Sequence, residues 1–166
     1  EYVMGDFTGF ITAIDNCSGT TSENQDVAIG TAFAAGGPYP VILSIADDIN
    51  NTATCSFNIT VADNTDPVIT GCAPDTTISA DANCEYAMGD FTGFITTIDN
   101  CSSNILETQD VAIGSTYPLG GPYPVMLTIT DDFNNAATCS FDITVADNTA
   151  PIINCPNNSN VAADIN

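Results

Sequence analysis

The chain has 166 residues, of which 21 are Asp or Glu and none is Lys, Arg or His, so its formal net charge at pH 7 is −21. Binding to nucleic acid is excluded, because no basic side chain is present to neutralise a phosphate. Attachment to anionic lipid through a basic patch is excluded for the same reason.

Hydrophobic residues make up 44% of the chain and alternate regularly with polar ones, which favours a packed fold over disorder. No apolar run approaches the length of about 18 residues that a membrane span requires. No basic segment precedes such a run either, so the sequence predicts neither membrane insertion nor a signal peptide. We interpret it as a mature or internal part of an extracellular protein.

An internal repeat with a period of 84 residues organises the sequence. Residues 1–67 align without a gap with residues 85–151, and 48 of the 67 positions are identical. The stretch DNTDPVITGC at 63–72 returns as DNTAPIINC at 147–155. A unit of this size can close its own core, which a solenoid repeat cannot. We therefore expect an incomplete first domain (residues 1–65), a complete second domain (66–148) and the first strand of a third (149–166).

Strand patterning recurs along each unit. In chain order the candidates are FITAID (10–15), DVAIGTAF (26–33), PVILSIAD (40–47), ATCSFNITVAD (53–63) and DTTISA (75–80). The clearest is 53–63, where Cys55, Phe57, Ile59 and Val61 fall on one face and polar residues on the other.

The turn sequence DINN (48–51) joins the third and fourth of these strands, which predicts a β-hairpin. The second unit repeats this hairpin at 124–131 and 137–147. No segment shows a 3.6-residue period over a helical length. Roughly seven short strands per unit predict an all-β fold of tandem immunoglobulin-like β-sandwich domains with antiparallel strands.

Several spaced motifs carry a resemblance to a known family. CEYAMGDFTG (84–93), IDNC (98–101), TCSF (138–141) and DNTAP (147–151) follow one another in the order seen in the hyalin repeat. The chain resembles that immunoglobulin-like module, which occurs in tandem in secreted adhesive proteins, notably of gliding Bacteroidetes. The resemblance implies a location outside the cell or at its surface, and a structural or adhesive role. It implies no active site, because architecture defines the family.

Two features depart from the family pattern. The complete lack of basic residues is one. The other is the last hairpin turn, where the usual Gly-Asn is replaced by Asn50–Asn51 in the first unit and Asn134–Asn135 in the second.

Seven cysteines occur at repeated positions, without a CxxC spacing and without histidine, so disulfides in an oxidising compartment are favoured over a zinc site. The predicted sandwich puts the IDNC loop and the start of the ATCSF strand at the same pole. We therefore expect three disulfides and one cysteine that is unpaired or intermolecular, although four cysteines allow three connectivities. The expected pairs are Cys17–Cys55, Cys101–Cys139 and Cys72–Cys84, with Cys155 left over.

Catalysis is not expected. A general base or an oxyanion donor would have to come from carboxylates, hydroxyls and the backbone alone, since His, Lys and Arg are absent. The carboxylate pairs Asp47–Asp48 and Asp131–Asp132 could in principle hydrolyse a glycoside. Both pairs stand where a strand enters a turn, however, and Asp is common there for local hydrogen bonding. We predict no catalytic residue.

A calcium site is the most specific binding hypothesis that the sequence offers. Calcium prefers several carboxylate and carbonyl oxygens from separate segments. The linker between the units supplies two acids, and the pole of the second unit that the linker reaches supplies three more. The alternative is that these acids are solvated turn residues. The candidate ligands are Asp63, Asp66, Asp99, Asp131 and Asp132.

Glycan attachment is also expected. Five asparagines stand in N-x-S/T sequons, and Asn58 lies on the outward face of its strand, as an attachment site must. The DTT at 75–77 resembles an O-glycosylation signal of some Bacteroidetes proteins, with Thr76 as its acceptor. The candidate asparagines are Asn16, Asn50, Asn58, Asn100 and Asn157.

Two classes of function remain open. The first is a structural or adhesive repeat protein in which residues 149–166 of one copy complete the domain formed by residues 1–65 of the next, either by strand complementation or as a covalent tandem chain. Such a head-to-tail contact does not close and propagates as a filament. The alternative is a carbohydrate- or ligand-binding module of a larger secreted protein. It would use exposed aromatic residues such as Tyr39, Tyr117 and Tyr123.

Overall fold

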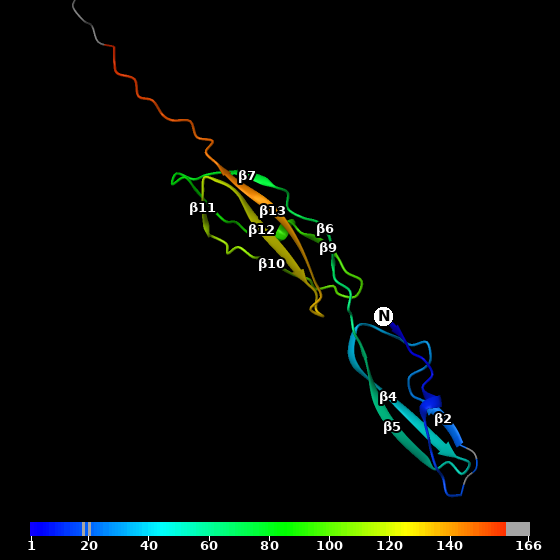
Figure 1. Cartoon of the computed structure of the whole chain (residues 1–166). Coiled ribbons are helices and arrows are strands. Elements are labelled where there is room, and N and C mark those ends of the chain that lie inside the picture. Colours follow the sequence, from blue (N-terminus) through cyan, green and yellow to red (C-terminus); the bar gives the residue numbers. More distant parts are fainter. Residues whose placement is uncertain (18, 20, 159–166) are drawn as a thin grey trace, which may run out of the picture.

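The computed structural model describes residues 1–17, 19 and 21–158. Two β-rich domains follow one another along the chain, and residues 149–158 extend beyond the second domain (Figure 1). The prediction of an all-β fold is confirmed, because short 3-10 turns are the only helical segments in the described part of the chain. None of its helices is long and apolar enough to cross a membrane.

The second domain is a β-sandwich. One sheet has the strand order β10-β12-β13-β7, in which β7 runs parallel to β13 and the other pairs are antiparallel. The pairs β6–β9 and β8–β11 form the opposing layer. Its elements are β6 (Val68–Gly71), β7 (Thr76–Ser79), β8 (Glu85–Ala87), η2 (Thr92–Phe94), β9 (Thr96–Ile98), β10 (Leu106–Gln109), β11 (Thr116–Pro118), β12 (Gly120–Thr130) and β13 (Ala136–Ala146).

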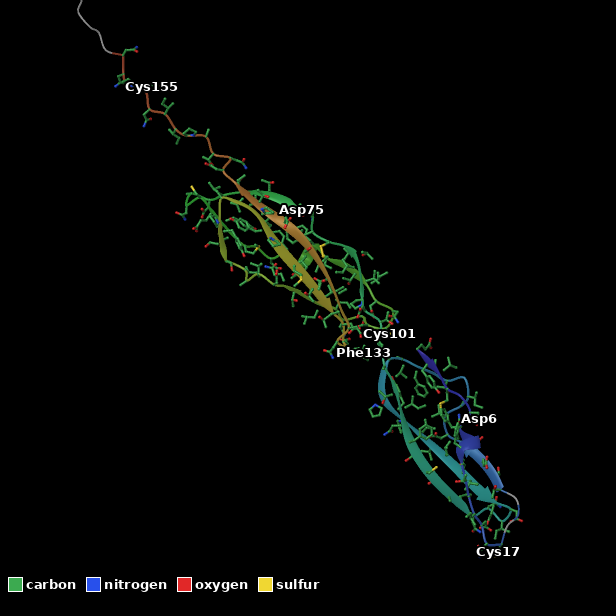
Figure 2. All side chains as sticks on the ribbon, viewed as in Figure 1. Asp6, Cys17, Asp75, Cys101, Phe133 and Cys155 are labelled. Atoms are coloured by element: carbon green, nitrogen blue, oxygen red, sulfur yellow. A yellow bond between two sulfur atoms is a disulfide. The ribbon has the colours of Figure 1, made fainter. Side chains whose placement is uncertain are left out.

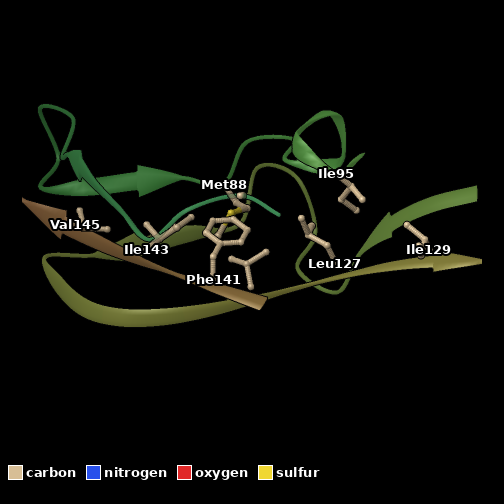
Figure 3. Packing of buried hydrophobic residues seen from close by; sticks show 9 residues of the cluster. Met88, Ile95, Leu127, Ile129, Phe141, Ile143 and Val145 are labelled. Atoms are coloured by element: carbon tan, nitrogen blue, oxygen red, sulfur yellow. The ribbon is translucent and has the colours of Figure 1, made fainter. Parts of the chain in front are cut away.

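The core of the second domain lies between these two layers (Figure 3). The long hairpin β12–β13 supplies most of it, because every second residue of each strand points inward. Met88 and Ile95 close the core from the opposing layer. Each large side chain that is buried in this way contributes about 1.5–3 kcal/mol. The buried residues of the hairpin are Val125, Leu127, Ile129, Phe141, Ile143 and Val145.

The first domain has the same hairpin but fewer partners for it. Its larger sheet has the order β2-β4-β5, and β1 pairs with β3. Within the described residues, β4 is the only strand that pairs with β5. The elements are β1 (Tyr2–Val3), η1 (Thr8–Phe10), β2 (Thr21–Gln25), β3 (Ala32–Phe33), β4 (Gly36–Asp47) and β5 (Thr52–Val61).

The first domain is an open sandwich. Residues 12–14 are the repeat counterparts of β9 but form no strand in the described chain, because nothing there takes the place of β6 beside them. Consequently Phe57 and Ile59 of β5 are only partly buried, whereas their counterparts Phe141 and Ile143 are 3% and 0% exposed.

The turn of each hairpin is organised by one aspartate. The Oδ1 atom of Asp47 accepts hydrogen bonds from the backbone N–H groups of Ile49 and Asn51, at 3.0 and 2.7 Å. The Asn51 side chain donates to Oδ2 at 2.8 Å. Asn50 sits between them with a φ of 66°, in the left-handed region that Asn tolerates better than most residues. Asn50 therefore fills a position in which a Gly or an Asn is favoured.

The hydrogen bond from the Asn51 side chain is the main cause that lowers the pKa of Asp47 below its ordinary value of 3.8, with the backbone N–H groups of Asn51 and Ile49 acting in the same direction against desolvation. A lowered folded-state pKa contributes stability above the unfolded value, and this contribution is lost as the pH falls through the folded pKa. We expect Asn51→Ala to raise the pKa of Asp47 toward 3.8 and to reduce the loss of stability on acidification. Carboxyl NMR titration would measure the pKa. An unchanged pKa in the variant would contradict this account of the turn.

Candidate functional site

Three aspartates from separate segments converge where the linker meets the second domain. Asp63 follows β5, Asp99 follows β9 and Asp131 follows β12. One carboxylate oxygen from each lies within 4.8 Å of the others. Asp63 and Asp131 are each only 6% exposed, and Asp99 is partly buried. We call these three residues the junction cluster.

Local turns hold each carboxylate of the junction cluster in place. Asp99 Oδ1 accepts hydrogen bonds from the N–H groups of Cys101 and Ser102, at 2.8 and 2.6 Å. Asp63 Oδ1 accepts one from Thr65 N–H at 3.1 Å. In both residues the other oxygen, Oδ2, is buried and has no hydrogen-bond partner among the described residues. Asp63 and Asp99 therefore each have one carboxylate oxygen that is buried and accepts no hydrogen bond from the described residues.

Asp131 repeats the turn chemistry of Asp47 and also connects to the linker. Its Oδ1 accepts from the N–H groups of Phe133 and Asn135, both at 2.8 Å, and its Oδ2 accepts from the Asn135 side chain. Burial raises the pKa of Asp131, but these hydrogen bonds outweigh that effect and lower the pKa below its ordinary value. The Asn135 side chain also donates to the carbonyl of Asp63 at 3.2 Å. The β12–β13 turn is therefore hydrogen-bonded directly to the linker.

The junction cluster has no counterion in the protein. The chain contains no Lys, Arg or His, so no side chain can balance three carboxylates at this distance. Burial strengthens their mutual repulsion, because less water is present to screen it. Most buried polar groups in proteins are satisfied, and an exception calls for an explanation such as a bound ion.

The remaining two candidate calcium ligands do not join this cluster. Asp66 is exposed on the linker. Asp132 is exposed and accepts hydrogen bonds from Asn104 Nδ2 and Ser102 Oγ, at 3.1 and 3.3 Å. Asp66 is three residues from Asp63 and Asp132 is adjacent to Asp131, but neither carboxylate belongs to the junction cluster.

The second domain contains one disulfide, between Cys72 and Cys139, with a Cα–Cα distance of 6.4 Å. The predicted pairs Cys101–Cys139 and Cys72–Cys84 are therefore wrong. Cys139 lies four residues along β13 from Asn135, which is about 13 Å from the turn. Cys101 remains at the end of the domain near Phe133, as Figure 2 shows. Cys139 instead points inward between the layers and reaches Cys72, directly after β6 in the opposing layer.

The other cysteines are exposed and have no disulfide within the described structure. The predicted pair Cys17–Cys55 is thus not formed, for the same geometric reason as in the second domain. Cys55 is the repeat counterpart of Cys139, and the counterpart of Cys72 is Cys155. The equivalent of the observed disulfide would therefore join residues from the two ends of the chain. The exposed cysteines are Cys17, Cys55, Cys84, Cys101 and Cys155.

The candidate glycosylation sites differ in accessibility. All five asparagines are exposed, and Asn58 lies on the outer face of β5. Thr76 is partly buried, and its hydroxyl donates to the carbonyl of Pro74 at 2.8 Å. Ser18 and Ser159, the third residues of the Asn16 and Asn157 sequons, lie outside the described residues. The exposed asparagines are Asn16, Asn50, Asn58, Asn100 and Asn157.

The three tyrosines of the ligand-binding hypothesis pack within their own domains. Tyr39 lies against Phe33 with ring centroids 4.7 Å apart, and Tyr123 lies against Tyr117 at 4.8 Å. The hydroxyls of Tyr39 and Tyr123 donate to backbone carbonyls of Ala34 and Pro118. All three rings are partly buried. They pack within their own domains where the strands begin and do not form an exposed aromatic surface for a ligand.

No family model matches the sequence, and no curated protein matches it.

The disulfide leads to a prediction for the second domain. It closes a loop with a sequence separation of 67 residues, for which the chain-entropy model gives a stabilisation of about 4 kcal/mol. We expect Cys139→Ser to lower the free energy of unfolding of the second domain by about this amount, measured by urea denaturation. Cys84→Ser is the matched control and should leave it unchanged. Equal destabilisation by the two variants would contradict the observed pairing.

Proposed function

We propose that the protein is an extracellular structural or adhesive repeat protein that forms a rod or filament of serial immunoglobulin-like domains. In this assembly, residues 149–166 of one copy complete the sandwich formed by residues 1–65 of the next. Residues 159–166 of that segment lie outside the described residues, and the supporting observations concern residues 149–158. The observation that carries the proposal is the open groove of the first domain.

The groove lies where the second domain holds β6. Residues 11–14 form one side of it, and Leu43, Ile45 and Cys55 form the other. Their counterparts in the second domain include β9, which pairs with β6, and Cys139, which is bonded to Cys72. Residues 12–14 thus present the edge to which a strand seated like β6 would add, because an unpaired edge takes up an added strand readily. The free edge of β5 is a separate edge, at the position where β13 pairs with β7, and the repeat counterpart of β7 lies outside the described residues.

Residues 150–155 have the sequence to fill this groove. APIINC corresponds to DPVITGC at 66–72, with one residue fewer. Ile152 and Ile153 are 93% and 84% exposed, and they correspond to Val68 and Ile69 of the β6 strand. Figure 2 shows the segment with Cys155 extended away from the second domain. Ile69 packs against the core of the second domain, so burying Ile153 in the same way in a neighbouring groove would contribute about 1.5–3 kcal/mol. Val68 stays 55% exposed, so Ile152 would be covered only in part.

The positions of the cysteines support the alignment of residues 150–155 with β6. A strand seated like β6 brings Cys155 to Cys55 of the next copy, as Cys72 meets Cys139 within the second domain. In an oxidising compartment the two thiols can exchange with an external disulfide, which is reduced to two thiols while the new S–S bond forms. A covalent tandem chain in which a further unit follows residue 166 would have the same geometry and the same cysteine pair.

The resemblance to the hyalin repeat supports an extracellular or surface location, and the Cys72–Cys139 disulfide is compatible with it. The exposed sequon asparagines leave room for surface glycans. The alternative of a carbohydrate-binding module has no comparable observation behind it, because its candidate tyrosines are engaged in packing.

We expect the oxidised full-length chain to form a ladder of disulfide-linked multimers on non-reducing gels. Cys55→Ser and Cys155→Ser should each abolish the ladder, whereas Cys84→Ser, which changes another exposed cysteine, should preserve it. Ile152→Asp/Ile153→Asp should prevent assembly even under reducing conditions, because Ile153 would take the position of Ile69, which packs against the core, and a charge is costly to bury there.

Light scattering in reducing buffer separates strand addition from the covalent link. A wild-type chain that stays monomeric at every concentration, with or without oxidation, would contradict the proposal. A ladder that survives in the Cys155→Ser variant would contradict the proposed register.

A further inference from the structure

We propose that the junction cluster of Asp63, Asp99 and Asp131 binds a calcium ion that fixes the interdomain linker to the second domain. All three residues belong to one chain, so this site does not depend on the assembly proposed above. Two independent observations meet here: three carboxylate oxygens lie within 4.8 Å of one another, and two buried carboxylate oxygens are without a partner among the described residues.

The partnerless oxygens point to a ligand and not merely to a charged surface. Asp63 is only 6% exposed, and bulk water cannot reach its Oδ2 atom. A protein would gain by replacing such an acid unless something neutralises it. In a chain without a single basic residue, that partner has to come from solution.

The donor set selects the type of cation. All three donors are carboxylate oxygens, which suit hard cations, whereas zinc sites use His and Cys. Calcium binds oxygens at 2.3–2.6 Å, so ligands on opposite sides of the ion stand about 5 Å apart, which matches the spread of this cluster. Magnesium requires a tighter and nearly octahedral arrangement and retains several waters. Calcium tolerates an irregular set from three separate loops, with water completing the shell.

Binding here would act on the linker. Asp63 follows the last residue of β5 by two positions, and the linker enters β6 at Val68. Without an ion, the hydrogen bond from Asn135 to the Asp63 carbonyl is the contact that ties this residue to the β12–β13 turn. A cation shared with Asp99 and Asp131 adds two further attachment points from different loops of the second domain. The linker then becomes part of that domain's end surface.

The repeat extends the same site along a filament. Asp15 and Asp47 are the counterparts of Asp99 and Asp131, and Asp147 is the counterpart of Asp63. In the assembly proposed above, Asp147 of one copy would meet Asp15 and Asp47 of the next. This extension rests on the proposed function, and it predicts one calcium ion per monomeric chain and two per chain in the filament.

The test uses the whole chain, freed of metal by a chelator and dialysed, in the monomeric Ile152→Asp/Ile153→Asp/Cys155→Ser form and without reductant, so that the Cys72–Cys139 disulfide stays intact. Isothermal titration with CaCl₂ should show one site, with the affinity of about 10⁻⁴–10⁻³ M that is typical of extracellular modules or tighter. Calcium should also raise the thermal midpoint. Titration with MgCl₂ should give clearly weaker binding.

Matched variants locate the site. Asp63→Asn and Asp99→Asn should weaken calcium binding at least tenfold and abolish the rise in midpoint, while Asp66→Asn and Asp132→Asn should behave as wild type. Asp63→Asn retains an Oδ1 that can accept from Thr65, so its fold should persist. Without calcium it should be at least as stable as wild type, because one repelling charge is gone. That reversal of stability order between calcium-free and calcium-bound protein would not follow from a purely structural role.

Each contrary result overturns the inference in an identifiable way. Absence of binding heat and of any midpoint change at about 10 mM calcium would refute the site. Equal losses in Asp66→Asn and Asp63→Asn would place binding elsewhere, and equal affinity for magnesium would refute the choice of calcium. Failure of assembly, by contrast, would leave the monomer's single site intact, so the two proposals can fail separately.

Discussion

In the second domain, β6 lies beside β9 and delivers Cys72 to the inward face of β13, so that the layer opposite the long hairpin is complete. The burial of Ile129, Phe141 and Ile143 depends on this closure. The first domain shows the consequence of leaving the position open. A nearly identical hairpin folds there and buries Val41 and Leu43, yet Ile45, Phe57 and Ile59 remain partly exposed. Residues 12–14 do not become a strand. Strand formation on that side is thus a tertiary effect, decided by whether a partner strand is present.

The absence of basic residues is a further constraint on this fold. Most of the aspartates that enter turns are compensated by local hydrogen bonds. For Asp47 and Asp131 these come from an asparagine side chain and from backbone N–H groups, and together they lower the pKa of both carboxyls. A chain without basic residues can fold because such turns replace ion pairs. The junction cluster is where this arrangement stops short, since local N–H groups satisfy one oxygen of Asp63 and Asp99 but leave the other. The calcium proposal follows from that difference.

Much of the fold follows from local pattern. The alternation of Cys55, Phe57, Ile59 and Val61, and the Asp and Asn residues between strands, predict the hairpin and its turn because both depend on neighbours in sequence. The cysteine pairing was mispredicted because it depends on depth within the sandwich. Placing Cys139 at the pole ignored its distance from the turn, although its position on the same face as Phe141 already indicated that it points at the opposing layer. The cluster of acids was predicted only in part for a related reason. Asp131 and Asp132 are adjacent, but the turn uses the first as its cap and directs the second to solvent.

Whether a neighbouring copy closes the first domain is decided most directly by cryo-electron microscopy of the oxidised wild-type assembly. The account predicts a thread of domains in which residues 150–155 of one copy lie along residues 11–14 of the next, with continuous density between Cys155 and Cys55. A groove left empty, or residues 149–158 folded back onto the first domain of their own chain, would contradict it.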